Sequence, residues 1–263
     1  MSKLYYKTLR VEKLQSHQIE RMYFVFSRYY QDTCLNKFKD DLLKKDSVFL
    51  LFDDTEHAIQ GFSTIVNINL KIDEKKIRGV FSGDTVIEKK YWGQGTLGKA
   101  FLKYLFMQKV KSPFKPLYWY LISKGYKTYL LMANNFNTHY PRYEKDTPPM
   151  EQKILNAFGH NLYPKEYNIK TGLIAFSSND NLKDSLKTKA APITEGMLNE
   201  NPKISFFNKK NPNWIKGDEL ACIAQMTLFM PIYYQLKIFI KLSKQIIPPL
   251  RLKINTKKMT SEN

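Results

Sequence analysis

Two early segments of the chain carry apolar residues at the spacing of an amphipathic helix. In the first, residues 16–31, one face collects Ile19, Met22, Tyr23, Phe26 and Tyr30. Ser16 is a residue type that caps helix N-termini, so we expect this helix to begin there. In the second, residues 34–45, the shorter apolar stripe consists of Leu35, Phe38 and Leu42. Each predicted helix therefore has one face to bury against a larger element.

Three β-prone runs come next and supply that element. Residues 47–52 form a compact apolar run, residues 59–70 alternate between apolar and polar positions, and residues 77–87 form a third run. Short polar segments separate the runs, at residues 53–56 and 71–76. The pattern predicts three strands in an antiparallel meander.

A glycine-rich segment follows directly from the third strand. Residues 82–101 begin as a strand, pass through Gly93, Gly95 and Gly98, and continue as an apolar pattern with helical spacing. Glycines let a backbone approach a ligand closely, and the free N–H groups at a helix start attract phosphate or another anion. The segment is therefore predicted to be a strand, an anion-binding turn and a helix.

The second half of the chain alternates between strand and helix patterns. Strands are predicted at residues 117–122, 172–176 and 217–228, and helices at 123–136 and 150–158, with a strand as the alternative for the Tyr-Leu-Leu-Met run inside 123–136. These assignments divide the chain into three parts. They are a core at 1–176, a long excursion with a returning strand of the same domain at 177–228, and a basic amphipathic tail at 229–263.

Composition adds a strong positive charge. The 263 residues include 42 lysines and arginines against 24 acidic residues, which gives a formal net charge of +18. A field of that size favours an anionic partner: nucleic acid, an anionic membrane, an acidic carrier protein or a phosphorylated cofactor. Solvated surface lysines are an alternative of nearly equal weight. Nucleic acid is the least favoured partner, because the chain has no helix-turn-helix, zinc or RNP-like motif.

The cysteines, histidines and N-terminus predict a reduced, cytoplasmic setting. Cys34 and Cys222 lie far apart in apolar-rich segments, which predicts two buried free thiols. The scattered histidines show no metal-ligand spacing, so we expect no metal site. The N-terminus lacks a signal-peptide core, and no apolar run reaches the roughly 18 residues of a membrane span. Peripheral contact with an anionic membrane, through the basic tail, stays open.

The order of the predicted elements and the sequence of the glycine segment resemble those of the GNAT-type acyltransferase superfamily. In that family a strand runs into a loop of the pattern Arg or Gln, two residues, Gly, one residue, Gly or Ala, and residues 91–100 look like this loop. The resemblance covers approximately residues 10–140. It implies an α/β fold with a mixed, mostly antiparallel sheet flanked by helices, here with a C-terminal extension. It also implies that the strand ending at Asp84 separates from strand 117–122 to admit a pantetheine arm.

The resemblance further implies roles for individual residues. The phosphates of the donor would lie on the turn and the helix start, at Trp92, Gly93, Gln94, Gly95, Thr96, Gly98 and Lys99. Ser123 would touch the pantetheine arm. Asp84 would orient or deprotonate the acceptor, and Tyr126 or Tyr129 would protonate the leaving sulfur. The implied donor is acyl-CoA or the phosphopantetheine thioester of an acyl carrier protein, whose acidity would suit the positive charge.

Two departures from the family pattern keep a second hypothesis open. Trp92 stands where the family usually has a basic residue, and Leu97 interrupts the expected glycine spacing. The leading hypothesis is an acyltransferase that acts on an amine or hydroxyl acceptor. The alternative is a catalytically silent GNAT-like module that binds a ligand or a membrane as a regulatory protein.

Overall fold

The computed structural model describes residues 2–31, 33–176, 185–186, 192–230, 232–233 and 235. The chain divides into two compact units, 1–228 and 229–263, and the first unit contains the sheet. The predicted basic tail, residues 229–263, lies almost entirely outside the described residues. Among the helices that are described, none is long and apolar enough to cross a membrane.

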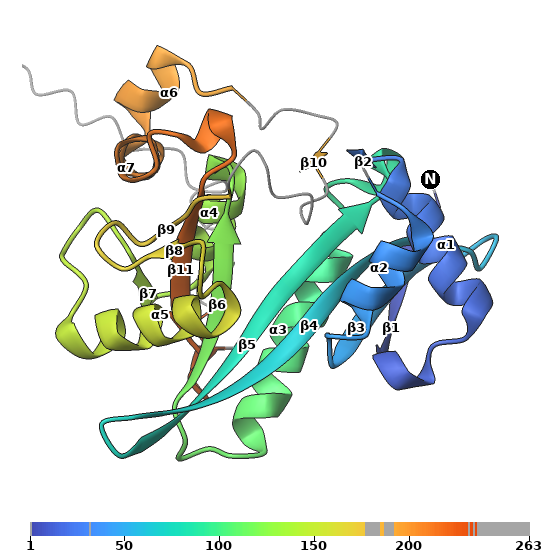
Figure 1. Ribbon diagram of the computed structural model, residues 1–263, viewed down its shortest axis with the longest axis horizontal. Coiled ribbons are helices and arrows are strands. Elements are labelled where there is room, and N and C mark those ends of the chain that lie inside the picture. The colour runs from blue at the N-terminus through green and yellow to red at the C-terminus, as the bar shows by residue number, and fades with distance from the viewer. Residues whose placement is uncertain are drawn as a thin grey trace, which may run out of the picture. The chain divides into compact units, whose positions relative to one another are not determined.

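A large mixed sheet organises the first unit (Figure 1). Its strands are β1 (Leu4–Arg10), β3 (Ser47–Asp53), β4 (Ile59–Ile72), β5 (Lys75–Ile87), β6 (Leu117–Ser123), β7 (His139–Tyr140), β8 (Tyr167–Asn168), β9 (Leu173–Ile174) and β11 (Glu219–Gln225). They lie in the order β1-β3-β4-β5-β6-β11-β9-β8, and β7 pairs with β11. The described pairings are antiparallel except for β5 with β6. This mixed, mostly antiparallel sheet with flanking helices confirms the predicted fold class.

The predicted meander is present as β3, β4 and β5, and it gains an edge strand that the sequence pattern did not predict. Strand β1 pairs antiparallel with β3, from Leu4 opposite Asp53 to Arg10 opposite Ser47. Most of its side chains keep some exposure because it lies at the edge of the sheet. An edge strand therefore shows little of the apolar patterning that marks the buried strands.

The two predicted helices, α1 (Ser16–Ser27) and α2 (Leu35–Leu42), cover one face of the sheet (Figure 1). Their core includes Met22, Phe26, Phe38 and Leu42 from the helices and Val48, Leu50, Phe62 and Val86 from the strands. The predicted cap at Ser16 is wrong. Gln15 caps α1, because its side chain and that of Gln18 exchange hydrogen bonds with each other's backbone N–H groups.

Helix α3 (Thr96–Val110) packs on the opposite face of the sheet (Figure 1). Successive strand residues point to opposite faces, so Phe49 points away from α1 and α2 where Leu50 faces them. The Phe49 ring lies 6.0 Å from Phe101 and 5.7 Å from Tyr104, both on α3. Trp119 of β6 adds a contact at 4.8 Å from Phe101. Aromatic packing thus fixes α3 against both β3 and β6.

The second half completes the sheet. The ambiguous run forms helix α4 (Tyr126–Asn135), and the helix predicted at 150–158 is α5 (Pro149–Leu162). The strand predicted at 217–228 is β11, which pairs antiparallel with β6. The strand predicted at 172–176 shortens to β9. Each of these elements has the predicted type, with altered bounds.

The excursion contains short elements. Strand β10 (Ser185–Leu186) pairs antiparallel with β2 (Tyr30–Gln31), the short strand that follows α1 in the chain. Helices α6 (Glu195–Glu200) and α7 (Pro202–Lys210) follow, and the 3-10 turns are η1 (Val11–Lys13), η2 (Lys89–Tyr91) and η3 (Trp214–Lys216).

Of the two cysteines, Cys222 is a buried free thiol as predicted, whereas Cys34 is exposed. The prediction fails at Cys34 because that residue is the N-cap of α2 and lies outside its apolar stripe.

Candidate active site

Strands β5 and β6 separate halfway along their length. Parallel pairing joins residues 78–81 to residues 117–120 and ends there, whereas β5 continues to Ile87 and β6 to Ser123. Beyond Phe81, β4 is the one strand partner of β5 in the described part of the chain. Figure 1 shows the two strands diverging. Among the described residues, no strand pairs with residues 82–87 on the β6 side, although the Gly83 carbonyl accepts a hydrogen bond from the Thr85 hydroxyl and the Ile87 carbonyl accepts one from the Trp92 indole. The rest of this edge can pair with another extended molecule.

The turn at the end of β5 leads directly into α3. Gly93 and Gly95 have φ angles of +85° and +73°, in the left-handed region that favours glycine, and Gly95 is the N-cap of the helix. Gly98 lies in the first helical turn. A Cβ atom added at any of the three would meet no atom of the described residues within 4 Å. Open space therefore surrounds the start of α3, with room for a ligand.

Backbone N–H groups face that space. Those of Thr96, Leu97 and Gly98 find no acceptor among the described residues, and intrahelical bonding begins with the Lys99 N–H donating to Gly95. The exposed Lys99 side chain lies in the same turn. Free N–H groups and the positive end of the helix dipole can together hold phosphate.

Gln94 and Thr96 fasten the turn to β1. The Gln94 Oε1 atom accepts a hydrogen bond from the Leu4 N–H at 2.9 Å, and its Nε2 donates to the Ser2 carbonyl at 3.0 Å. The Thr96 hydroxyl donates to the Leu4 carbonyl at 3.4 Å. These predicted donor-binding side chains thus position the turn. A ligand there would meet the backbone and Lys99 instead.

The buried carboxylate of Asp53 holds η2 in place through a hydrogen bond from Tyr91. Asp53, at the end of β3, accepts hydrogen bonds from the hydroxyls of Ser2 and Tyr91 and from the N–H groups of Thr55 and Glu56. These bonds, that from Ser2 first, hold the pKa of Asp53 well below its usual range. No periodic pattern in the sequence predicted this anchor. The only local signal was an aspartate followed by a turn at a strand end.

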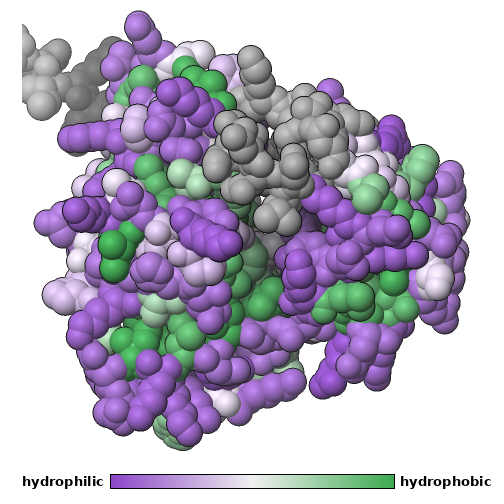
Figure 2. All heavy atoms as spheres, viewed as in Figure 1, coloured by the Kyte–Doolittle hydropathy of each residue, from purple (hydrophilic) through white to green (hydrophobic). Residues whose placement is uncertain are grey.

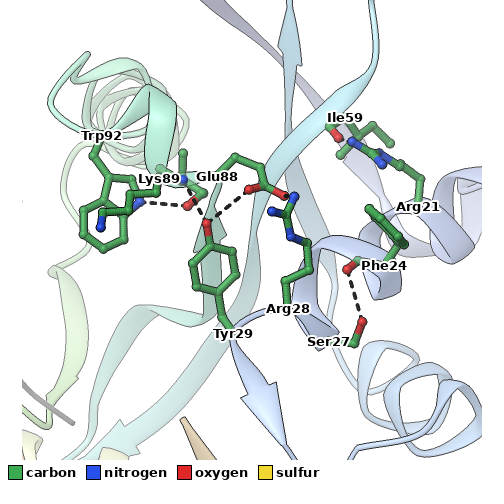
Figure 3. Close-up of polar contacts among 10 residues, drawn as sticks. Arg21, Phe24, Ser27, Arg28, Tyr29, Ile59, Glu88, Lys89 and Trp92 are labelled. Carbon is green, nitrogen blue, oxygen red and sulfur yellow. Dashed lines mark hydrogen bonds and ion pairs between the residues drawn. The ribbon is translucent and has the colours of Figure 1, made fainter. Parts of the chain in front are cut away.

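A cavity of about 590 Å³ lies beside the start of the turn. The end of α1, the start of β4 and the end of β5 line it with Arg21, Phe24, Arg28, Tyr29, Glu56, Gln60, Glu88, Lys89 and Lys90. Figure 3 shows Arg28 and Tyr29, which follow α1, meeting Glu88 at the end of β5. Four cations and two carboxylates give the cavity a mixed lining with a positive excess.

An ion-pair network forms the centre of the cavity wall (Figure 3). The Arg28 Nη1 atom lies 2.7 Å from the buried Glu88 carboxylate, and the Tyr29 hydroxyl donates to the same carboxylate at 3.2 Å. The Tyr29 oxygen in turn accepts the Lys89 N–H at 2.8 Å. Burial raises the pKa of Tyr29, and the Glu88 charge adds to the effect, so the hydroxyl stays neutral. No motif or periodic pattern in the sequence marked these residues.

Trp92 covers the other side of the turn. Its indole Nε1 donates to the Ile87 carbonyl at 2.8 Å, and the residue is 62% exposed. It therefore offers a flat apolar surface, in place of a positive charge, next to the predicted phosphate site.

Asp84 lies in the diverging part of β5, where the register with β4 shifts between Ser63 and Ile65. Burial raises the pKa of its carboxyl to about 6; the nearby Lys45 ammonium opposes the rise and the Asp41 carboxylate adds to it. Lys45 and Asp41 are themselves ion-paired at 3.0 Å. A carboxylate with a pKa near neutrality can accept a proton during catalysis.

The remaining predicted residues lie at the junction of β6 and α4. Ser123 is fully buried, and its hydroxyl has no hydrogen-bond partner among the described residues. Tyr126, the first residue of α4, is also buried. The Tyr129 hydroxyl donates to the Pro141 carbonyl at 3.1 Å, and burial raises its pKa far above the usual range. Of the two tyrosines, Tyr129 is thus held in a structural hydrogen bond.

No protein-family model and no curated protein matches this chain. Among solved structures, a probable N-acyltransferase from Enterococcus faecalis V583 is 13% identical with a TM-score of 0.39, over 50% of this chain and 32% of that one. A GNAT family acetyltransferase from Bacillus anthracis is 13% identical with a TM-score of 0.36, over 53% and 87%. A GNAT family N-acetyltransferase from Escherichia coli in complex with CoA is 12% identical with a TM-score of 0.34, over 47% and 64%.

The chain spans about a third of the length of the first of these proteins. At such identities and TM-scores, the matches carry no information on activity or substrate.

Proposed function

We propose that the protein transfers an acyl group from a CoA or acyl-carrier thioester to an amine or hydroxyl acceptor. The observation that carries the proposal is the separation of β5 from β6 beside a glycine turn with free N–H groups. An extended pantetheine arm can hydrogen-bond to the open edge of β5 as an added strand would. Its phosphates would then reach the start of α3.

The turn suits the phosphate end of such a donor. Three N–H groups, from Thr96 to Gly98, and the Lys99 ammonium would bind the phosphates. The open space beside Gly98 admits them without a clash. Gln94 and Asp53 contribute by holding the turn in place, which reduces the entropy lost on binding.

The chemistry would be direct attack in a ternary complex. The acceptor nitrogen or oxygen attacks the thioester carbonyl carbon, and Asp84 takes the proton that the acceptor loses. The tetrahedral intermediate collapses, the C–S bond breaks, and the thiolate takes a proton from Tyr126. A pKa of about 6 leaves Asp84 mostly ionised at neutral pH and able to act as this base.

We place the acceptor in the cavity around Arg28 and Glu88. The cavity and the Asp84 carboxyl lie on the same face of β5, since Asp84 interacts with charges at the end of α2 while α1 lines the cavity. Glu88 lies four residues beyond Asp84, about 13 Å along a strand. An acceptor that reaches both would be an extended molecule with an anionic group distant from its nucleophile.

A silent ligand-binding module is the second candidate. It is favoured by Trp92 at the usual basic position and by the Gln94 amide, which is fully engaged with β1. Such a module would bind the acyl donor but would not release its thiol, whichever acceptor is added.

Thiol release from acyl-CoA and from an acyl carrier protein, assayed with a panel of amines and alcohols, separates the two candidates. We expect turnover by the wild type and a kcat lower by about 10²- to 10⁴-fold in Asp84→Asn, with donor affinity retained. Asp40→Asn, an exposed neighbour on α2, is the matched control and should retain activity. Donor binding without turnover would favour the silent module, and failure to bind any donor would contradict both.

A further inference from the structure

A second charged surface lies at the end of α3 farthest from the glycine turn. It consists of the β4–β5 hairpin, residues 69–78, and of the last α3 turn with the α3–β6 loop, residues 107–115; we name it the hairpin–loop patch. An open depression of about 590 Å³ lies between the two segments. Figure 1 shows the hairpin tip and the loop at the same end of the sheet.

Positive charge dominates the hairpin–loop patch. Its cations are Lys71, Lys75, Lys76, Arg78, Lys109, Lys111 and Lys115. Its two carboxylates, Asp73 and Glu74, are already ion-paired, Asp73 with Lys153 and Glu74 with Lys71 at 2.7 Å. Among the described residues that line the depression, none is acidic. Burial lowers the pKa of Lys109, and the neighbouring Arg78 charge lowers it further, as expected where cations crowd together.

Apolar side chains project from the same place. Phe114 is 98% exposed, and Met107 and Val110 are each nearly half exposed. Met107 and Val110 are three positions apart on one side of the last turn of α3, and Phe114 lies in the loop that follows. Figure 2 shows hydrophilic side chains over most of this end, with a small apolar area at its outer edge. Exposed apolar groups rimmed by charge mark an interaction surface.

Hydrogen bonds between the hairpin and α3 hold Phe114 in this exposed position. Arg78 donates from both guanidinium ends to Gln108, to the carbonyl and to the side-chain oxygen, each at 2.8 Å. Lys109 Nζ donates to the Lys115 carbonyl at 2.9 Å, and the Lys115 N–H donates to Ser112. The loop is therefore fixed from both sides, and its apolar tip is presented to a partner without a further ordering cost.

We infer that the hairpin–loop patch docks on an anionic membrane surface. Phe114, Val110 and Met107 would enter the headgroup and acyl boundary, and the lysines would lie among the lipid phosphates. The aliphatic side chains favour lipid over nucleic acid, which binds cations and stacking aromatics but gains little from Met and Val. An acyl carrier fits poorly, because the 15 residues of α3 separate the patch from the glycine turn by about 22 Å.

Co-sedimentation of the full chain with vesicles tests the inference. The probes are vesicles of phosphatidylcholine alone and of phosphatidylcholine mixed with phosphatidylglycerol. The variants are the double change Lys111→Gln with Lys115→Gln, and Phe114→Ala. Matched controls elsewhere on the surface are Lys165→Gln with Lys170→Gln, and Leu43→Ala, whose residue is 71% exposed. Unchanged thermal unfolding of each variant establishes that it folds.

We expect the wild type to bind the anionic vesicles. The double lysine variant should bind about 25-fold more weakly, from about 5-fold per lysine, and Phe114→Ala should also bind more weakly. The controls should bind as the wild type does. The inference is overturned if the wild type ignores anionic vesicles, if the patch variants bind unchanged, or if the controls weaken equally. A duplex nucleic acid serves as a further probe. If the patch variants lose binding to the duplex but bind anionic vesicles as the wild type does, the inference is also overturned.

Discussion

Asp84 shows how a single residue couples the proposed chemistry to stability. Its carboxyl has an ordinary pKa of 3.8 and a pKa of about 6 in the folded chain, chiefly because of burial. Between these values the folded state binds a proton that the unfolded state has released. Stability therefore falls as pH rises from about 4 to about 6, and the charged form at neutral pH costs up to about 3 kcal/mol. A role for the Asp84 carboxylate as the base of the proposed acyl transfer would explain why the chain keeps a residue that destabilises the fold.

The variant Asp84→Asn should remove that pH dependence. We expect the free energy of unfolding to exceed that of the wild type by about 1 to 3 kcal/mol near pH 7, and the difference to vanish below about pH 4. Urea unfolding at a series of pH values measures both. Parallel curves for the two proteins over this range would show that Asp84 titrates normally.

The Arg28–Glu88 pair makes a second prediction at the residue scale. Arg28→Met should destabilise the fold more than Glu88→Gln, because the first leaves a buried carboxylate with only Tyr29 beside it, whereas the second leaves a solvated guanidinium. We expect about 2 kcal/mol for Arg28→Met, since the arginine is half exposed, and about 1 kcal/mol for Glu88→Gln. Arg10→Met, which breaks an exposed pair with Glu12, is the control and should change little. The reverse order, measured in urea, would contradict the assignment.

At the scale of elements, the glycine turn depends on parts of the chain far from it. Gln94 and Thr96 bind β1, and Tyr91 binds Asp53 at the end of β3. The turn is thus built on the sheet edge, and its conformation is set before any ligand arrives. Preorganised N–H groups bind an anion with less loss of entropy than a mobile loop would.

Gln94→Ala should therefore loosen both elements. Losing the bond to Leu4 of β1 and the bond to Ser2 just before it should cost about 1 to 2 kcal/mol of stability and speed amide exchange at Leu4. Hydrogen exchange followed by mass spectrometry measures the amide exchange rates of both β1 and the start of α3. Gln152→Ala, which removes one bond within α5, is the control. Unchanged exchange in β1 would mean that Gln94 does not hold the turn.

The same elements show what sequence patterns can predict. Helices α1 and α2 and strands β3 to β5 each bury one face, so their periodicity predicted them. The edge strand β1 buries little and was missed. The Tyr91–Asp53 and Arg28–Glu88 contacts join residues 38 and 60 positions apart, and no local pattern encodes such a distance. Asp84 was singled out because a family resemblance marked its position, whereas its raised pKa comes chiefly from burial, which no sequence pattern showed.

At the scale of the whole molecule, the net charge of +18 includes two separated concentrations. One surrounds the glycine turn, with Lys89, Lys90 and Lys99, and the other is the hairpin–loop patch at the far end of α3. If the patch lies on a membrane, the turn lies at the opposite end of α3, up to about 22 Å further from the bilayer. Donor and acceptor would then reach the site from solution, so activity towards soluble substrates should not require vesicles.

Calorimetric titration of CoA into the wild type, Gly98→Ala and Gly98→Glu tests donor binding most directly. Both substitutions fit the open space at Gly98, and both residues favour a helix more than glycine does, so all three proteins should fold. The glutamate, however, places a negative charge where the phosphates would bind. We predict CoA binding by the wild type and Gly98→Ala, and at least about tenfold weaker binding by Gly98→Glu, equivalent to about 1.4 kcal/mol. Equal affinity in all three proteins, or no heat with the wild type, would contradict a donor site at the start of α3.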